Sequence, residues 1–123
     1  MKKIKEIKII ISPKFGAGWL TWSSYLSRKQ QVIILTDSIL ISAVEKQDNI
    51  LFQKRVEELQ ELFTAEHNRE TKCQYGPALC TQKVKKYRVI KVNPPFGILD
   101  YDGAESITPF SAEPYCFLPE DFE

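Results

Sequence analysis

Residues 3–22 read KIKEIKIIISPKFGAGWLTW, and this stretch decides how the fold begins. Isoleucines alternate with charged residues over its first positions and end in the run Ile9-Ile10-Ile11. β-Branched side chains at a spacing of two residues favour an extended backbone, so we predict a strand over residues 3–12. Residues 14–22 follow Ser12-Pro13, contain two glycines and three aromatic side chains, and are predicted to form a loop.

Apolar residues at helical spacing follow in the middle of the chain. Thr36-Asp37-Ser38 offers side chains that can cap a helix, and Asp48-Asn49 offers a second cap. Beyond the second cap, apolar residues recur every three to four positions among glutamates and glutamines, which predicts a helix over residues 50–66. These recurring residues are Phe52, Val56, Leu59 and Phe63. The apolar run at residues 32–35 has the length of a strand.

The last third of the chain contains strand and turn signals. Residues 87–92 predict a strand, and Asn93-Pro94-Pro95 can reverse the chain so that residues 96–101 return as its partner. Asp102-Gly103 is a turn dipeptide. Together these elements predict an α+β fold, in which a small, mostly antiparallel sheet packs on a two-helix segment formed by residues 37–66.

The chain has 123 residues, a length that suits one compact domain. We assign residues 1–107 to a single α+β domain and residues 108–123 to an acidic, aromatic, proline-containing C-terminal extension. All 17 basic residues lie within residues 1–91, beside nine acidic ones, whereas residues 92–123 hold seven acidic and no basic residues. The extension could therefore pack on the basic part of its own chain or contact a partner.

Composition argues against several classes of function. The net charge of +1 disfavours non-specific binding of nucleic acid. No apolar run approaches the ~18 residues that a membrane span needs, and the basic N-terminal segment lacks the features of a secretory signal. The cysteine count is odd, with Cys73, Cys80 and Cys116, which is typical of reduced thiols. We therefore expect a cytoplasmic protein without a membrane partner.

The loop of residues 13–22 carries the first group of candidate binding residues. Gly16 and Gly18 allow a left-handed backbone or a close approach to a ligand, and successive N–H groups in such a loop could cradle an anion. Trp19 and Trp22 could stack on a planar ring. Alternatively, the loop is a structural turn whose tryptophans belong to the core, and both interpretations are open at this point.

The block Asp100-Tyr101-Asp102-Gly103-Ala104-Glu105 places three carboxylates within six residues. Carboxylates this close can share a metal, act as acid and base, or bind ribose hydroxyls, and the alternative is a solvated turn capped by Asp102. The cysteines and His67 lack the spacing of zinc ligands, and no nucleophile–base pair or cofactor motif stands out. We predict no catalytic residue, no metal site and no cofactor.

Residues 9–22, IIISPKFGAGWLTW, resemble the opening of a family of small bacteriophage and bacterial proteins of unknown activity. The family pattern is a strand followed by Ser-Pro-Gly-Phe-Gly-Ala-Gly-Trp-x-Thr-Trp. Leu35-Thr36-Asp37 before a helix and a hairpin like residues 97–107 also match, so the resemblance covers most of residues 4–107. Lys14 stands where the family more often has glycine, which adds a charge to the loop. The family usually ends soon after its Tyr-Asp-Gly-x-Glu-Ser block.

The two matching blocks would share one edge of the sheet if the first and last strands are parallel neighbours. There they could form a pocket for a nucleotide-like ligand. The candidate ligand-binding residues are Lys14, Phe15, Gly16, Gly18, Trp19, Trp22, Asp100, Tyr101, Asp102 and Glu105. Together with the resemblance, this pocket predicts a non-catalytic, phage-type binding protein. We expect an inhibitor of host defence that sequesters a nucleotide-like signal in the host cytoplasm.

Two alternative functions are open on the sequence alone. The chain could be a protein–protein interaction module that blocks a host protein through the aromatic residues of its acidic tail. These residues are Phe110, Tyr115, Phe117 and Phe122. The chain could also be an enzyme that uses the carboxylates of residues 100–105, with or without a metal. A homodimer is a further option, because the isoleucine-rich strand offers an edge for self-association.

Overall fold

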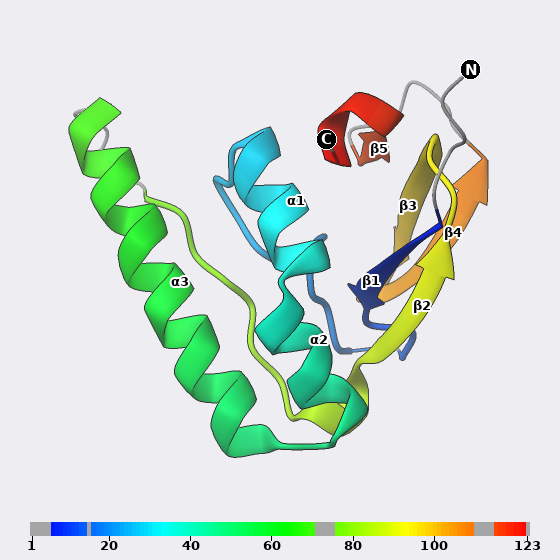
Figure 1. Cartoon of the computed structure of the whole chain (residues 1–123), viewed down its shortest axis with the longest axis horizontal. Helices are drawn as coiled ribbons and strands as arrows, with labels where there is room; N and C mark the ends of the chain where they lie inside the picture. Colours follow the sequence, from blue (N-terminus) through cyan, green and yellow to red (C-terminus); the bar gives the residue numbers. More distant parts are fainter. Residues whose placement is uncertain (1–5, 15, 71–75, 110–114, 123) are drawn as a thin grey trace.

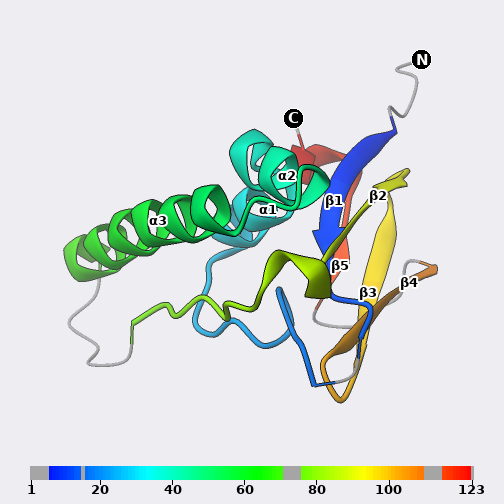
Figure 2. The same cartoon turned by 90° about the horizontal axis from the view of Figure 1, so that it is seen from below.

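The computed structural model describes residues 6–14, 16–70, 76–109 and 115–122. It confirms the predicted α+β class, with helices on one side of the molecule and two small antiparallel sheets on the other (Figure 1). Helices α1 and α2 lie between the long helix α3 and the strands, and α3 extends away from the sheets (Figure 2).

The helical half contains one helix more than the predicted pair within the described residues. Helix α1 spans Arg28–Thr36, α2 spans Ser38–Glu45 and α3 spans Asn49–Glu70. The strand-sized apolar run at residues 32–35 lies inside α1. The reason is a capping box that the sequence prediction missed: Ser27 accepts a hydrogen bond from the Gln30 N–H, and the Gln30 side chain accepts one from the Ser27 N–H. This reciprocal cap satisfies two N–H groups at the helix start.

The first sheet pairs two strands that are far apart in the sequence. Strand β1, Ile7–Ile11, runs antiparallel to β2, Arg88–Val92, with Ile9 opposite Ile90. A short 3-10 helix, η1 at Val84–Lys86, leads into β2. Both faces of β1 are covered, because Ile9, Ile10 and Ile11 are all buried. The predicted strands over residues 3–12 and 87–92 are therefore present, within the described residues.

The second sheet has the order β4-β3-β5. Its strands are β3, Phe96–Tyr101, β4, Ala104–Pro109, and β5, Cys116–Phe117. The prediction that residues 96–101 pair with residues 87–92 is wrong, because β3 pairs with β4 and β5 while β2 pairs with β1. Pro94 and Pro95 separate β2 from β3, and prolines have no N–H with which to continue a ladder.

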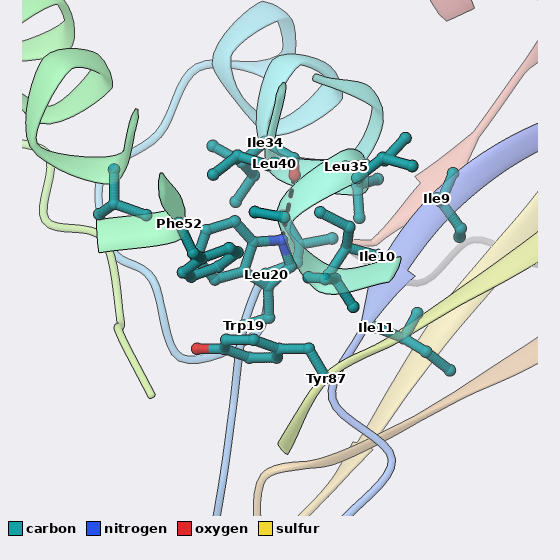
Figure 3. Packing of buried hydrophobic residues seen from close by; sticks show 14 of the residues in the cluster. Ile9, Ile10, Ile11, Trp19, Leu20, Ile34, Leu35, Leu40, Phe52 and Tyr87 are labelled. Carbon is teal, nitrogen blue, oxygen red and sulfur yellow. Dashed lines mark hydrogen bonds between the residues drawn. The ribbon is translucent and has the colours of Figure 1, made fainter. Parts of the chain in front are cut away.

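The core forms where α1 and α2 pack on the strands of the first sheet and α3 packs on α2. Trp19, Phe52 and Tyr87 make an aromatic cluster with ring centroids 5.2–5.5 Å apart (Figure 3). The indole N–H of Trp19 donates to the Ile34 carbonyl over 3.1 Å, so this buried polar group is satisfied. Trp19 thereby links the loop after β1 to helix α1.

The described part of the C-terminal extension packs on the domain. Phe117 in β5 is fully buried, and its ring contacts Phe96 and Phe122, the last of these in the 3-10 helix η2 at Pro119–Phe122. Arg28 lies 4.8 Å from the centre of the Phe117 ring and donates to the Cys116 carbonyl over 2.6 Å. These aromatic side chains are thus engaged within the fold. Phe110 lies outside the described residues, and the division at residue 107 stays a prediction.

Among the described helices, none combines the length and the apolar character that a membrane span requires.

Candidate functional site

The two sequence blocks meet where β1 ends and β4 begins. The Gly16 N–H donates to the Asp102 carbonyl over 2.6 Å, and the Glu105 N–H donates to the Ser12 carbonyl over 2.6 Å. The convergence that the sequence suggested is therefore present. Its expected cause, parallel pairing of the first and last strands, is wrong, because these strands belong to different sheets. Side-chain and loop contacts bring the blocks together instead.

A tight turn between β3 and β4 receives the ring of Trp22. Asp102 and Gly103 both have positive φ, 50° and 86°, as a two-residue hairpin turn requires. A Cβ atom at Gly103 would lie 2.7 Å from Cζ2 of Trp22, and a Cβ atom at Gly18 would overlap the same ring. These two glycines are needed because an indole packs against their backbone.

Glu105 is a buried carboxylate held by hydrogen-bond donors from the loop. Only 2% of its surface is exposed. Oε1 accepts from the Ser12 N–H over 2.9 Å, and Oε2 accepts from the Thr21 N–H over 2.8 Å, the Thr21 hydroxyl over 3.0 Å and the Trp19 N–H over 3.3 Å. The N–H groups that hold this anion are not those of the predicted cradle at Gly16 and Gly18, because the Gly16 N–H donates to the Asp102 carbonyl. The anion is a side chain of the same protein, and its donors flank the glycines.

Ser12 completes the junction between the two sheets. Its side chain is fully buried, and its hydroxyl makes hydrogen bonds to the carbonyls of Ala17 and Gly103, the latter over 3.1 Å. Its backbone N–H and carbonyl both bind Glu105. Ser12 and Thr21 were not among the predicted site residues, because a small polar residue at a strand end gives no signal until its distant partner is known.

Burial raises the pKa of Glu105, because loss of hydration outweighs the hydrogen bonds from Ser12, Trp19 and Thr21, which favour the ionised form. Within the described residues, no Lys, Arg or His forms an ion pair with this carboxylate. Burial likewise raises the pKa of the Tyr115 hydroxyl, and the charges of Asp100 and Glu105 add to that effect. The junction is therefore stabilised by hydrogen bonds rather than by charge pairing.

The predicted site residues divide into buried and exposed groups. Trp19 and Gly18 are buried, so the alternative interpretation of a core tryptophan is correct for Trp19. Trp22 keeps 41% of its surface exposed and Tyr101 keeps 75%. The remaining exposed residues are Lys14, Gly16, Asp100 and Asp102. Phe15 lies outside the described residues.

The exposed members surround the β3–β4 turn, and we call Lys14, Trp22, Asp100, Tyr101 and Asp102 the turn surface. The Asp100 carboxylate forms a hydrogen bond within the turn, because its Oδ1 accepts from the Gly103 N–H over 2.8 Å. No three of the His, Cys, Asp and Glu side chains in the described ranges cluster closely enough to hold a metal ion. The turn surface presents aromatic rings and both signs of charge to solvent.

A separate hollow of about 490 Å³ lies between β1, the α1–α2 junction and η2. Ile7, Val32 and Phe122 are among the apolar residues that line it, and Lys8 and Asp121 add charge. Of the predicted site residues that the structure describes, none lines this hollow.

Comparison with known proteins returned no match, either to a protein-family model, to a curated protein or to a solved structure.

Proposed function

We propose that this protein is a non-catalytic binding protein that recognises a partner protein through the turn surface. The observation that carries the proposal is the internal use of the backbone N–H groups around the loop: those of Ser12, Trp19 and Thr21 bind Glu105, and that of Gly16 binds the Asp102 carbonyl. The second group expected to hold a nucleotide, the ring of Trp19, is in the core. The residues left to contact a ligand therefore suit a macromolecular surface better than a small anion.

The chemistry of the turn surface supports a protein partner. Trp and Tyr are the side chains that most often anchor protein interfaces, because they bury a large area at a small entropic cost. Trp22 rests on Gly18 and Gly103, so its position is fixed before binding. Asp102 and Lys14 are exposed and carry charges of opposite sign, and such charges favour one partner orientation over others.

By its resemblance to the phage and bacterial family, the partner we propose is a bacterial host protein, and the effect of binding is inhibition of a host defence activity. On the same basis, we propose that it acts in the host cytoplasm.

A photo-crosslinking experiment tests the proposal. A photoreactive phenylalanine analogue is placed at Tyr101 in the full chain, which is expressed in bacterial cells and irradiated. We expect one discrete crosslinked product that is lost in the Trp22→Ala background. The control position is Ile50, the N-terminal end of α3, where 84% of the side chain is exposed and no product is expected.

Two results would contradict the proposal. Equal crosslinking from positions 50 and 101 would mean that the turn surface has no special affinity. A rise in melting temperature with cyclic or linear nucleotides, present in the wild type and absent in Trp22→Ala, would favour the nucleotide-sequestering function instead, since a ligand stabilises the state it binds.

A further inference from the structure

A second charged surface lies on η1 and β2, at residues 83–91. Residues 71–99 contain six basic and no acidic residues. Five of the six are described, and we call them the basic strip: Lys83, Lys85, Lys86, Arg88 and Lys91. Lys86 is half-buried and the other four are exposed.

The basic strip is not neutralised by the described part of the protein. Elsewhere, Lys8 pairs with Glu45 over 3.3 Å and Arg55 pairs with Asp37 over 2.8 Å. No described carboxylate forms an ion pair with any member of the strip. Lys91 even stands opposite Lys8 in the β1–β2 register, and like charges in that position destabilise a sheet. These cations therefore have no anionic partner among the described residues and are available to an external anion.

Strand β2, which carries Arg88 and Lys91 of the strip, is also an edge strand. Among the described strands, β2 pairs only with β1. Strand β2 is also the more exposed of the two strands. Arg88 and Lys91 of β2 are exposed and Val89 and Ile90 are half-buried, whereas β1 is covered on both faces. Alternate N–H and carbonyl groups on the outer side of β2 can therefore accept a further strand.

We propose that the basic strip and the outer edge of β2 form a docking site for an extended acidic peptide segment of a partner protein. Main-chain hydrogen bonds to β2 hold the peptide backbone, and the cations at positions 83–91 select acidic side chains. A polypeptide fits better than a nucleic acid, because only a peptide backbone can pair with the strand edge. The one aromatic residue between positions 83 and 91 is Tyr87, which is 4% exposed and cannot stack on a base.

Binding to synthetic probes tests this site on the full-length protein. The first probe is a peptide of about twelve residues in which Glu alternates with Val or Thr, a pattern that favours a strand. The second is the same peptide with alternate backbone nitrogens methylated, which removes one row of N–H donors. The third is a short DNA duplex. Each is titrated by surface plasmon resonance at low and at physiological salt, because screening weakens charge contacts.

Charge reversal then locates the contact. In the double variant Arg88→Glu, Lys91→Glu we expect affinity for the unmethylated peptide to fall by about tenfold or more, as when charged contacts at an interface are reversed. The matched control is the double variant Lys29→Glu, Lys54→Glu, which changes the net charge of the protein by the same amount. Lys29 lies on α1 and Lys54 on α3, and both are exposed. This control should change the affinity for the peptide less than about twofold. Circular dichroism confirms that each variant folds.

Each remaining outcome overturns the proposal. Absence of peptide binding removes the site. Equal loss in both double variants means that only net charge matters. Equal affinity for the methylated peptide excludes strand addition, and tighter, strip-dependent binding of the DNA duplex makes the strip a phosphate-binding surface. The crosslinking result at Tyr101 does not bear on this site, so the two proposals fail separately.

Discussion

At the scale of single residues, Glu105 is the position on which the most contacts depend. A carboxylate can accept several hydrogen bonds at once, and at this position four donors converge on its two oxygens. In the sequence, Glu105 is one of three closely spaced acidic residues and has no feature that distinguishes it from Asp100 and Asp102. The structure separates them, because Glu105 is buried and the two aspartates are exposed.

Replacing Glu105 with Gln should destabilise the protein. The amide has almost the same shape, but its NH₂ group cannot accept, so N–H groups of Trp19 or Thr21 are left unsatisfied. Such a loss costs about 1–3 kcal/mol. Urea unfolding measures the change, and Asp102→Asn is the control, since it removes one charge from an exposed position whose positive φ suits asparagine. Equal stability of the two variants would contradict a structural role for the carboxylate.

The raised pKa of Glu105 predicts a pH dependence of stability. The folded state binds this proton more tightly than the unfolded chain, whose glutamates titrate near a pKa of about 4.3. The resulting stabilisation is complete below that value and is lost as the pH rises through the higher pKa of the folded state. The stability difference between wild type and Glu105→Gln should therefore be largest in acid and decrease as the pH rises. A difference that grows with pH would show that the hydrogen bonds outweigh burial.

At the scale of elements, local signals were sufficient for some segments and insufficient for others. The helix at Asn49–Glu70 and the turn at Asp102-Gly103 follow from periodicity and turn chemistry, which depend on neighbouring residues alone. The Ser27–Gln30 cap is also local, and its residues mark the start of helix α1 in the sequence. The pairing of β2 with β1 is not local, since about 80 residues separate the strands, and only packing selects it over the nearer β3.

The candidate site shows the same division. Glycines and aromatic residues marked the loop, and clustered carboxylates marked the turn, so the meeting of the two blocks could be anticipated. Which side chains face inward could not, because Trp19 and Trp22 have the same chemistry and only the surrounding core decides that Trp19 is buried.

Strand β5 should contribute strongly to stability although it is short. Phe117 is fully buried between Phe96 and Phe122, so Phe117→Ala leaves a cavity and should cost about 3–5 kcal/mol. The neighbouring Leu118 is 43% exposed, and Leu118→Ala should stay within about 0.5 kcal/mol of the wild type. Thermal unfolding compares the two variants. Similar melting temperatures would mean that the extension is dispensable for folding.

At the scale of the whole molecule, the two small sheets can unfold together only if contacts between them couple their stability. Ser12 and Glu105 provide a direct link, and Gly16 with Asp102 adds one more hydrogen bond beside it. A two-stranded sheet is marginally stable alone, so the β1–β2 pair depends on the helices and on this link.

Breaking the link should divide the molecule into regions of unequal stability. In the wild type, we expect backbone amides of the β1–β2 and β3–β4 ladders to exchange hydrogen at similar rates. In Glu105→Gln, amides of the β3–β4 hairpin should exchange roughly tenfold faster while those of β1–β2 change less, because the hairpin opens locally. Native-state exchange read by mass spectrometry measures both. Parallel acceleration of the two ladders would mean that they open only together.

The unlike placement of the two tryptophans gives the protein two natural fluorophores with different surroundings. Trp19 is enclosed by the core, whereas Trp22 keeps 41% of its surface in contact with solvent. Emission from Trp19 should be blue-shifted and shielded from acrylamide, and emission from Trp22 red-shifted and readily quenched. A partner that covers the turn would therefore protect the emission of Trp22 from quenching. Unfolding would instead shift the emission of Trp19 to longer wavelength, so fluorescence distinguishes binding from unfolding.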